Sequence, residues 1–178
     1  MTESIPLYQD NKDKETRKMI DEQTLMENHW REMIADYDVP QTIILARHLG
    51  VDMDDAQSYI DSEDYLVLTD EEANEAVREE IEEMVWAFTP SFLSAHTGVD
   101  SGTLRTMQES LCENANEPIT AMIKDFDWFV EDAVRCDGRG HFLAGYDHEE
   151  NYEDYLSVVR NDRCYETKKE TYFIYRRN

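Results

Sequence analysis

The sequence predicts an α+β fold that is predominantly helical, with a small antiparallel sheet formed mainly by C-terminal strands. Two observations predict it: apolar residues recur at three- and four-residue steps through most of the chain, and short β-branched or aromatic runs follow near the end. With 178 residues, 40% of them apolar, the chain can bury a core. We expect a flexible arm at 1–14, a helical region at 15–64 and an α+β region at 65–178, with one continuous domain as the alternative.

Residues 15–35 predict an amphipathic helix, because their apolar positions repeat with helical spacing. Pro40 suits the first turn of a second helix that ends near Leu49, and Gly50 separates it from a short third helix at 51–60. The 42–60 pattern resembles a helix-turn-helix. Its second helix carries acids that a phosphate backbone would repel, namely Asp52, Asp54 and Asp55. An ordinary helical hairpin is therefore the favoured interpretation.

The run at 65–68 predicts a short strand, and 69–88 predicts the best-marked helix of the chain. Thr69 and Glu72 have the spacing of a capping box, and acids fill the first turn, where the helix dipole favours them. The apolar positions form one stripe: Ala73, Ala76, Val77, Ile81, Met84, Val85 and Phe88. The step from Thr89 to Pro90 then ends the helix.

The rest of the chain predicts two more helices, at 101–112 and 117–134, and a turn at 137–140. The runs at 141–146 and 172–176 are typical of strands in one antiparallel sheet. The runs at 65–68 and 156–159 are candidates to join that sheet.

The charge balance excludes several classes of partner. The chain has 41 Asp and Glu against 17 Lys and Arg, a net charge of −24. Affinity for nucleic acids and for anionic membranes depends on Lys and Arg, so we expect neither as a direct ligand. No apolar run is long enough for a membrane span, and the first residues lack a secretory signal. Three cysteines without a CxxC unit suggest reduced thiols, so a cytoplasmic location is expected.

Five glutamates of the 69–88 helix share one ridge opposite its apolar stripe: Glu72, Glu75, Glu79, Glu82 and Glu83. At a rise of 1.5 Å per residue, neighbours are about 4.5–6 Å apart along the axis, a spacing comparable with that of neighbouring phosphates. Arg78 is the only cation between residues 62 and 99. The ridge, together with Asp52, Asp54 and Asp55, predicts a surface that fits a basic groove. The alternative is a solvated acidic face that only keeps the protein soluble.

Signals for catalysis are weak. Cys136 and His141 are five residues apart, which makes a thiol–imidazole pair conceivable, although a buried helix end followed by a strand residue is the simpler interpretation. The acids around two histidines lack tight ligand spacing; they are His141, Asp147, His148, Glu149 and Glu150. No phosphate-binding glycine loop or hydrolase motif is present. We therefore expect a protein that is not an enzyme, with no catalytic residue, cofactor or metal.

Two stretches are similar to small acidic proteins of bacteriophages and other mobile elements. The first is YLVLTDEEA at 65–73, followed by VWAF at 85–88, and the second is DGRGH at 137–141 with YFIYRRN at 172–178. The resemblance implies expression inside a bacterial host, among genes that often counter defence systems. The segment 151–170 lies between the motifs as a long insertion.

Charge and resemblance together predict an anti-defence protein similar to DNA mimics. Its partner would be a host nucleic-acid-binding defence protein with a basic groove, such as a restriction or CRISPR effector. The first alternative is an acidic adaptor or regulator that binds through an apolar helical surface; the second is a small metal- or thiol-dependent enzyme. C-terminal cations such as Lys168, Lys169 and Arg176 are available to orient the chain or to join copies, so a homodimer is open.

Overall fold

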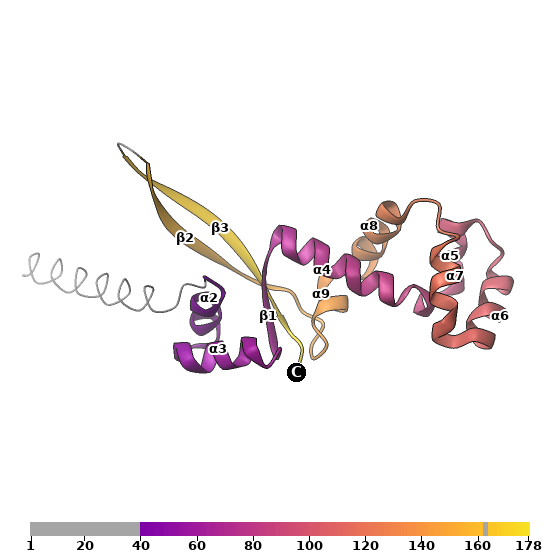
Figure 1. Cartoon of the computed structure of the whole chain (residues 1–178), viewed down its shortest axis with the longest axis horizontal. Coiled ribbons are helices and arrows are strands. Elements are labelled where there is room, and N and C mark those ends of the chain that lie inside the picture. Colours follow the sequence, from indigo (N-terminus) through magenta and orange to yellow (C-terminus); the bar gives the residue numbers. More distant parts are fainter. Residues whose placement is uncertain (1–39, 162–163) are drawn as a thin grey trace, which may run out of the picture.

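The computed structural model describes residues 40–161 and 164–178 (Figure 1). The expected arm at 1–14 and the expected helix at 15–35 lie outside the described residues. The molecule is elongated: the sheet and the first two described helices occupy one end, and a group of helices occupies the other (Figure 1). The predicted α+β class, mainly helical with a small antiparallel sheet, is confirmed.

A helical hairpin begins the described chain. Helix α2 spans Pro40–Leu49 and helix α3 spans Met53–Asp61, close to the predicted bounds. Gly50 joins them with φ +68°, a left-handed conformation that glycine adopts without a steric penalty. Asp52 is the N-cap of α3, since its carboxylate accepts a hydrogen bond from the Asp55 N–H at 2.9 Å. The predicted hairpin is therefore confirmed, and one of its acids has a structural task.

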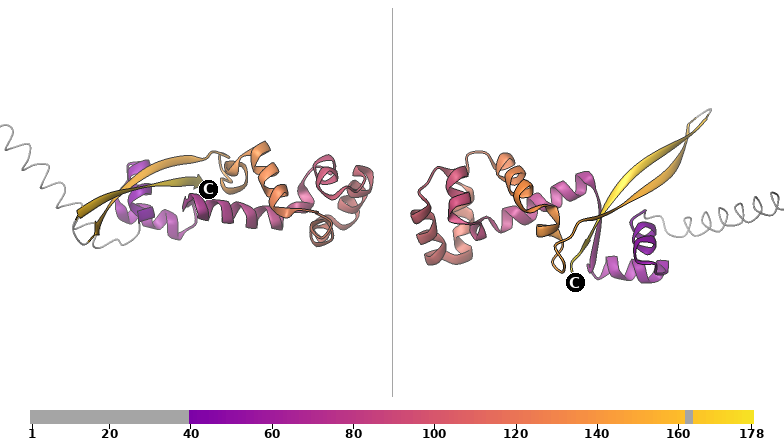
Figure 2. Two further views of the ribbon diagram at one scale, coloured as in Figure 1. Left: turned by 90° about the horizontal axis from the view of Figure 1, so that it is seen from above. Right: turned by 180° about the vertical axis from the view of Figure 1, so that it is seen from behind.

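The sheet has three antiparallel strands in the order β1-β3-β2. Strand β1 spans Tyr65–Thr69, β2 spans Asn151–Asn161 and β3 spans Cys164–Arg176. Strands β2 and β3 form a long hairpin that projects away from the helices (Figures 1 and 2). The segment at 151–170, noted in the sequence as an insertion, supplies most of this hairpin. The predicted strands at 65–68, 156–159 and 172–176 all belong to the sheet.

Helix α4 spans Asp70–Glu83 and carries the predicted capping box: Thr69 and Glu72 exchange hydrogen bonds between side chain and backbone. The helix ends earlier than predicted. Met84 leaves the helical conformation at φ −117° and ψ +16°, and the 3-10 turn η1 (Val85–Ala87) follows. The apolar stripe continues through Val85, which is why the sequence pattern did not reveal the end of the α-helix.

Three errors concern the second half of the chain. The sequence did not predict helix α5 (Pro90–Thr97), which begins at Pro90 and is capped by Thr89. Helix α6 (Ser101–Leu111) is as predicted, followed by the 3-10 turn η2 (Cys112–Ala115). The single helix expected at 117–134 is two helices, α7 (Asn116–Thr120) and α8 (Phe126–Asp137). Asp125 separates them, because its extended backbone lets its carboxylate cap the Trp128 N–H at 3.0 Å.

The third error concerns 141–146, which is not a strand. Residues Arg139–Leu143 form a short helix, α9, and Phe142, Leu143 and Ala144 pack inward in succession, which a strand with alternating faces does not allow. Gly140 has no side chain, and this allows its backbone to lie close to residues 148–150, which lead into β2. A Cβ atom there would lie 2.6 Å from the His148 carbonyl oxygen.

Two apolar clusters cover the two faces of the sheet. The larger one contains buried residues of the helices from α4 through α9 and the ring of Tyr175. Leu66 and Leu68 of β1 pack against this cluster. The smaller one places α2 and α3 against Val67 and Ile174. Neighbouring residues of a strand point to opposite faces, so the alternation of Leu66, Val67 and Leu68 assigns each face to one cluster. The α2–α3 hairpin thus shares a core with the sheet.

Arg139 joins the sheet to α4. Its guanidinium bonds to Glu150 and Asp70 carboxylates, each at 2.8 Å, and lies 4.2 Å from the centre of the Phe173 ring. The side chain is only 11% exposed. Burial lowers the pKa of Arg139, but the hydrogen bonds to Glu150 and Asp70 outweigh this effect, so the pKa is raised overall. The guanidinium is therefore a permanent cation at the junction.

Candidate functional site

The outer face of α4 is the strongest site candidate of the sequence, and its five glutamates are all exposed. At 3.6 residues per turn they lie within an arc of about 100° and span about 16 Å along the axis. The buried residues of the helix, Ala73, Val77 and Ile81, occupy the opposite side. Figure 2 (left) shows α4 along one border of the molecule, with α8 and α9 on its other side. We name these five side chains, Glu72, Glu75, Glu79, Glu82 and Glu83, the acidic face.

The acidic face is not neutralised by cations of the described residues. Within residues 40–161 and 164–178, no Lys or Arg nitrogen lies within 4.0 Å of its five carboxylates. The cations near α4 bind acids on its flanks instead: Arg139 binds Asp70 at 2.8 Å, Arg78 binds Asp127 at 2.5 Å, and Arg177 binds Glu80 at 3.5 Å. The negative charge of the face is therefore open to solvent.

One member of the acidic face has a second task. The Glu72 carboxylate accepts hydrogen bonds from the Thr69 N–H at 2.8 Å and from the Thr69 hydroxyl at 2.9 Å. These bonds fix its position at the start of the helix, because they complete the capping box. A glutamine at this position can keep the same bonds, whereas an alanine cannot.

The structure does not bring the acids of α3 to the acidic face. Asp52, Asp54 and Asp55 lie at the first turn of α3, the end farther from β1, and α4 begins on the other side of β1 (Figure 1). Asp52 is engaged as the N-cap of α3. The α3 acids and the acidic face are therefore two separate acidic regions, and a contribution of the α3 acids to partner binding stays a prediction.

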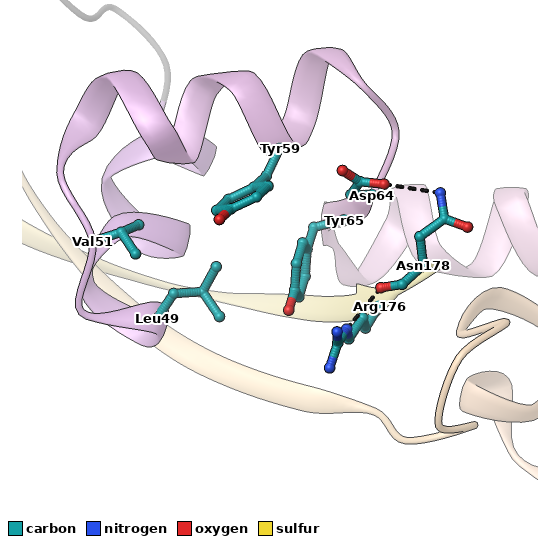
Figure 3. Close-up of a pocket in the computed structure, with 7 residues that line it drawn as sticks. All are labelled: Leu49, Val51, Tyr59, Asp64, Tyr65, Arg176 and Asn178. Atoms are coloured by element: carbon teal, nitrogen blue, oxygen red, sulfur yellow. Dashed lines mark hydrogen bonds between the residues drawn. The ribbon is translucent and has the colours of Figure 1, made fainter.

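A pocket of about 400 Å³ lies between the α2–α3 hairpin and the ends of β1 and β3 (Figure 3). Leu49 and Val51 come from the turn of the hairpin, and Tyr59 and Tyr65 place their rings beside them, 5.9 Å apart between centroids. The volume and the mainly apolar lining are typical of sites that hold a small molecule or one large side chain. The sequence analysis missed this pocket.

The polar wall of the pocket is held by the C-terminal residues. The Asp64 carboxylate accepts a hydrogen bond from the Asn178 amide at 2.8 Å (Figure 3). It accepts a second one from the Ser62 hydroxyl, also at 2.8 Å. These bonds, with the charge of Arg176, hold the pKa of Asp64 below its usual value. The Arg176 guanidinium stacks over the Tyr146 ring at 3.8 Å from its centre. No sequence signal links residues 64 and 178, because their contact depends on the pairing of β1 with β3.

Cys136 and His141 do not form the thiol–imidazole pair that was considered. Cys136 is exposed at the end of α8, and His141 is exposed in α9 with its ring 5.4 Å from that of His148. Among the described residues, no hydrogen bond joins the thiol to the imidazole, and no three His, Cys, Asp or Glu side chains gather closely enough to hold a metal ion. The proposed ligands around His141 and His148 are therefore not assembled.

Comparisons with known proteins add no relative. No protein-family model, curated protein or solved structure matches the chain. The resemblance to small phage proteins therefore stays a prediction. None of the helices in the described ranges is both long and apolar enough to cross a membrane.

Proposed function

We propose that the protein is a nucleic-acid mimic whose acidic face occupies the basic groove of a nucleic-acid-binding protein. The setting that the motif resemblance implies makes a restriction or CRISPR effector of a bacterial host the proposed target. The observation that carries this proposal is the regular row of exposed carboxylates on α4, with no described Lys or Arg nitrogen within 4.0 Å of them.

The arrangement of the cations supports this choice of surface. Arg139 and Arg177 pair with Asp70 and Glu80 of α4, and Arg78 of α4 pairs with Asp127 of α8, so the unpaired acids of α4 include all five of the acidic face. The buried stripe anchors the opposite side to the core. The anchored helix sets the spacing of the carboxylates along its axis before binding, and charge of one sign speeds the encounter with a basic groove.

The test uses a matched pair of charge variants. Glu75→Gln, Glu79→Gln, Glu82→Gln and Glu83→Gln, combined, remove four charges from the acidic face and leave the capping box intact. Glu109→Gln, Glu113→Gln, Glu117→Gln and Glu131→Gln, combined, remove four charges from exposed positions elsewhere. Inhibition of DNA cleavage is measured for a panel of purified restriction and CRISPR effectors. We expect the first variant to lose roughly 100-fold in inhibition and the control to keep it.

Two results would contradict the proposal. One is equal loss in both variants, which would mean that total charge matters and α4 does not. The other is the absence of inhibition by the wild-type chain across the panel. Circular dichroism of both variants shows whether the fold is retained.

A second candidate function is favoured by a specific observation, the pocket in Figure 3. We infer that, if the chain is an adaptor, this pocket receives a large apolar side chain of the partner. Binding would then depend on burial of apolar area and would be nearly insensitive to salt. Tyr59→Ala should weaken binding of a partner captured at high salt, and the α4 charge variant should not. The opposite pattern would remove the pocket from the mechanism.

A further inference from the structure

The β2–β3 hairpin differs in charge from the rest of the chain. Residues 151–176 contain five Lys and Arg and five Asp and Glu, a net charge of 0, whereas the rest of the chain carries −24. Its described acids are paired: Asp154 binds Lys169 at 2.7 Å, Glu170 binds Lys168 at 3.4 Å, and Glu153 binds Arg47 at 2.9 Å. Two copies of this protein would repel each other over most of their surfaces, but not at the hairpin.

The hairpin also holds its outer part away from the acidic body (Figures 1 and 2). The residues of β2 from Leu156 onward extend about 20 Å at 3.3 Å per residue. That length exceeds the Debye length of about 10 Å at 0.1 M salt. In two molecules joined through their hairpins, salt would therefore screen most of the repulsion between the acidic bodies, that is, between the parts of the two chains outside the hairpins.

Strand β2 lies at the edge of the sheet, because the strand order is β1-β3-β2. The Asp154 carbonyl points out of the sheet, where it accepts a hydrogen bond from the Arg47 guanidinium at 2.8 Å. Backbone groups alternate along an antiparallel edge strand, so those of Tyr152 and Leu156 point outward as well. Arg47 covers the edge at Asp154. At Leu156, no partner within the described residues covers the outward backbone groups.

The same positions expose apolar side chains. Leu156 is 62% exposed and Tyr152 is 68% exposed, on one face of the hairpin. An open edge with exposed apolar side chains is a template for pairing with another strand, and soluble proteins usually block such edges. A second strand beside β2 would satisfy the outward backbone groups and cover Leu156 in one step.

We propose that β2 pairs antiparallel with β2 of a second copy of this chain, about a two-fold axis near the outer half of the strand. The two three-stranded sheets then form one continuous six-stranded sheet. The pairing is isologous, so it closes at two copies and does not grow into a filament. This surface is separate from the acidic face of α4, and the proposal stands or falls independently of the proposed function.

The test is the oligomeric state of the full chain by sedimentation velocity, at about 0.05 M and about 0.5 M NaCl. We expect a particle of twice the 21.0 kDa mass of the chain. Salt should strengthen the dimer, because it screens the repulsion between the acidic bodies, whereas it should weaken binding to a basic groove. The two proposals therefore predict opposite effects of salt.

Two variants locate the interface. Leu156→Lys should weaken the dimer at least about 100-fold, because symmetry places the change twice in the interface. Leu156→Pro removes an outward N–H that makes no bond to β3, and it should have a similar effect while leaving the hairpin intact. Leu111→Lys is the control, because it makes the same change at another exposed leucine, on α6. It should leave the dimer unchanged. A wild-type monomer at about 0.1 mM, a concentration at which even a weak specific dimer forms, would overturn the proposal. So would a dimer that tolerates both changes at Leu156.

Discussion

The acidic face of α4 and the β2–β3 hairpin differ in whether their acidic side chains are paired with cations. In the hairpin, Glu153, Asp154 and Glu170 each have a cation within 4.0 Å. On the acidic face, the described residues supply none. Among the described residues, Arg47, Arg78 and Arg139 each join two elements, as Arg139 does between α9, α4 and the residue that precedes β2. The net charge of −24 is therefore distributed unevenly over the surface, and we expect the two regions to bind different partners.

The largest effect on stability is expected where the two regions are joined. Arg139→Ala leaves Glu150 and Asp70 without their cation and removes the stacking on Phe173. Because the guanidinium is only 11% exposed, we expect a loss of about 3 kcal/mol in the free energy of unfolding. Urea denaturation measures it. Arg135→Ala is the control: Arg135 pairs with Asp132 but is 74% exposed, and should cost less than about 1 kcal/mol. Equal costs would remove Arg139 from its structural role.

Neutralising the acidic face should have the opposite sign. Like charges at three- and four-residue spacing destabilise a helix by roughly 0.2–0.5 kcal/mol per pair. The four Glu→Gln changes on α4 relieve six such pairs and remove two favourable pairs with Arg78, a net relief of about four pairs. We expect the variant to be more stable by about 1–2 kcal/mol, with the difference shrinking at high salt. In the hairpin, Asp154→Asn should instead destabilise, because it breaks an ion pair. A destabilising effect on α4 would indicate that the glutamates have partners within the chain.

The sequence was sufficient for the features that depend on local signals. The capping box of Thr69 and Glu72, the glycine turn at Gly50 and the acidic face were all predicted, because each rests on residues within about three helical turns. The errors arose where distant contacts decide. Residues 141–146 have strand-like composition, but the contacts of Gly140 and Arg139 hold a short helix that ends at Leu143. The pocket at Asp64 and Asn178 depends on strand pairing, which no local pattern reveals.

The acids of α3 offer a smaller effect that separates structure from binding. Asp52→Ala removes the N-cap of α3 and should cost about 1 kcal/mol in stability, as measured by thermal unfolding. Asp52→Asn removes the charge but keeps an acceptor, so its stability should match the wild type. If Asp52→Asn weakened inhibition of an effector, the α3 acids would belong to the binding surface after all.

The smallest effect concerns the titration of one hairpin acid. The hydrogen bond from Lys169, joined by one from Thr171, holds the pKa of Asp154 below its usual 3.8. A lowered pKa contributes stability that is present above about pH 4 and is lost as the pH falls through the lowered value. Carbon-detected NMR should show Asp154 titrating below 3.8, and Lys169→Met should raise its midpoint. An unchanged midpoint in the variant would mean that the ion pair does not form in solution.

The proposed function requires the acidic face of α4 to compete with nucleic acid for a basic groove. Its most direct test is a competition experiment on an effector that the chain inhibits. Duplex DNA is titrated against the bound chain at several salt concentrations. We expect DNA to displace the wild-type chain completely from the effector. The affinity of the effector for the wild-type chain should fall steeply as the salt concentration rises, and its affinity for the four-glutamine α4 variant should fall much less steeply. A ternary complex of effector, DNA and chain, or identical salt slopes for the two chains, would contradict the account.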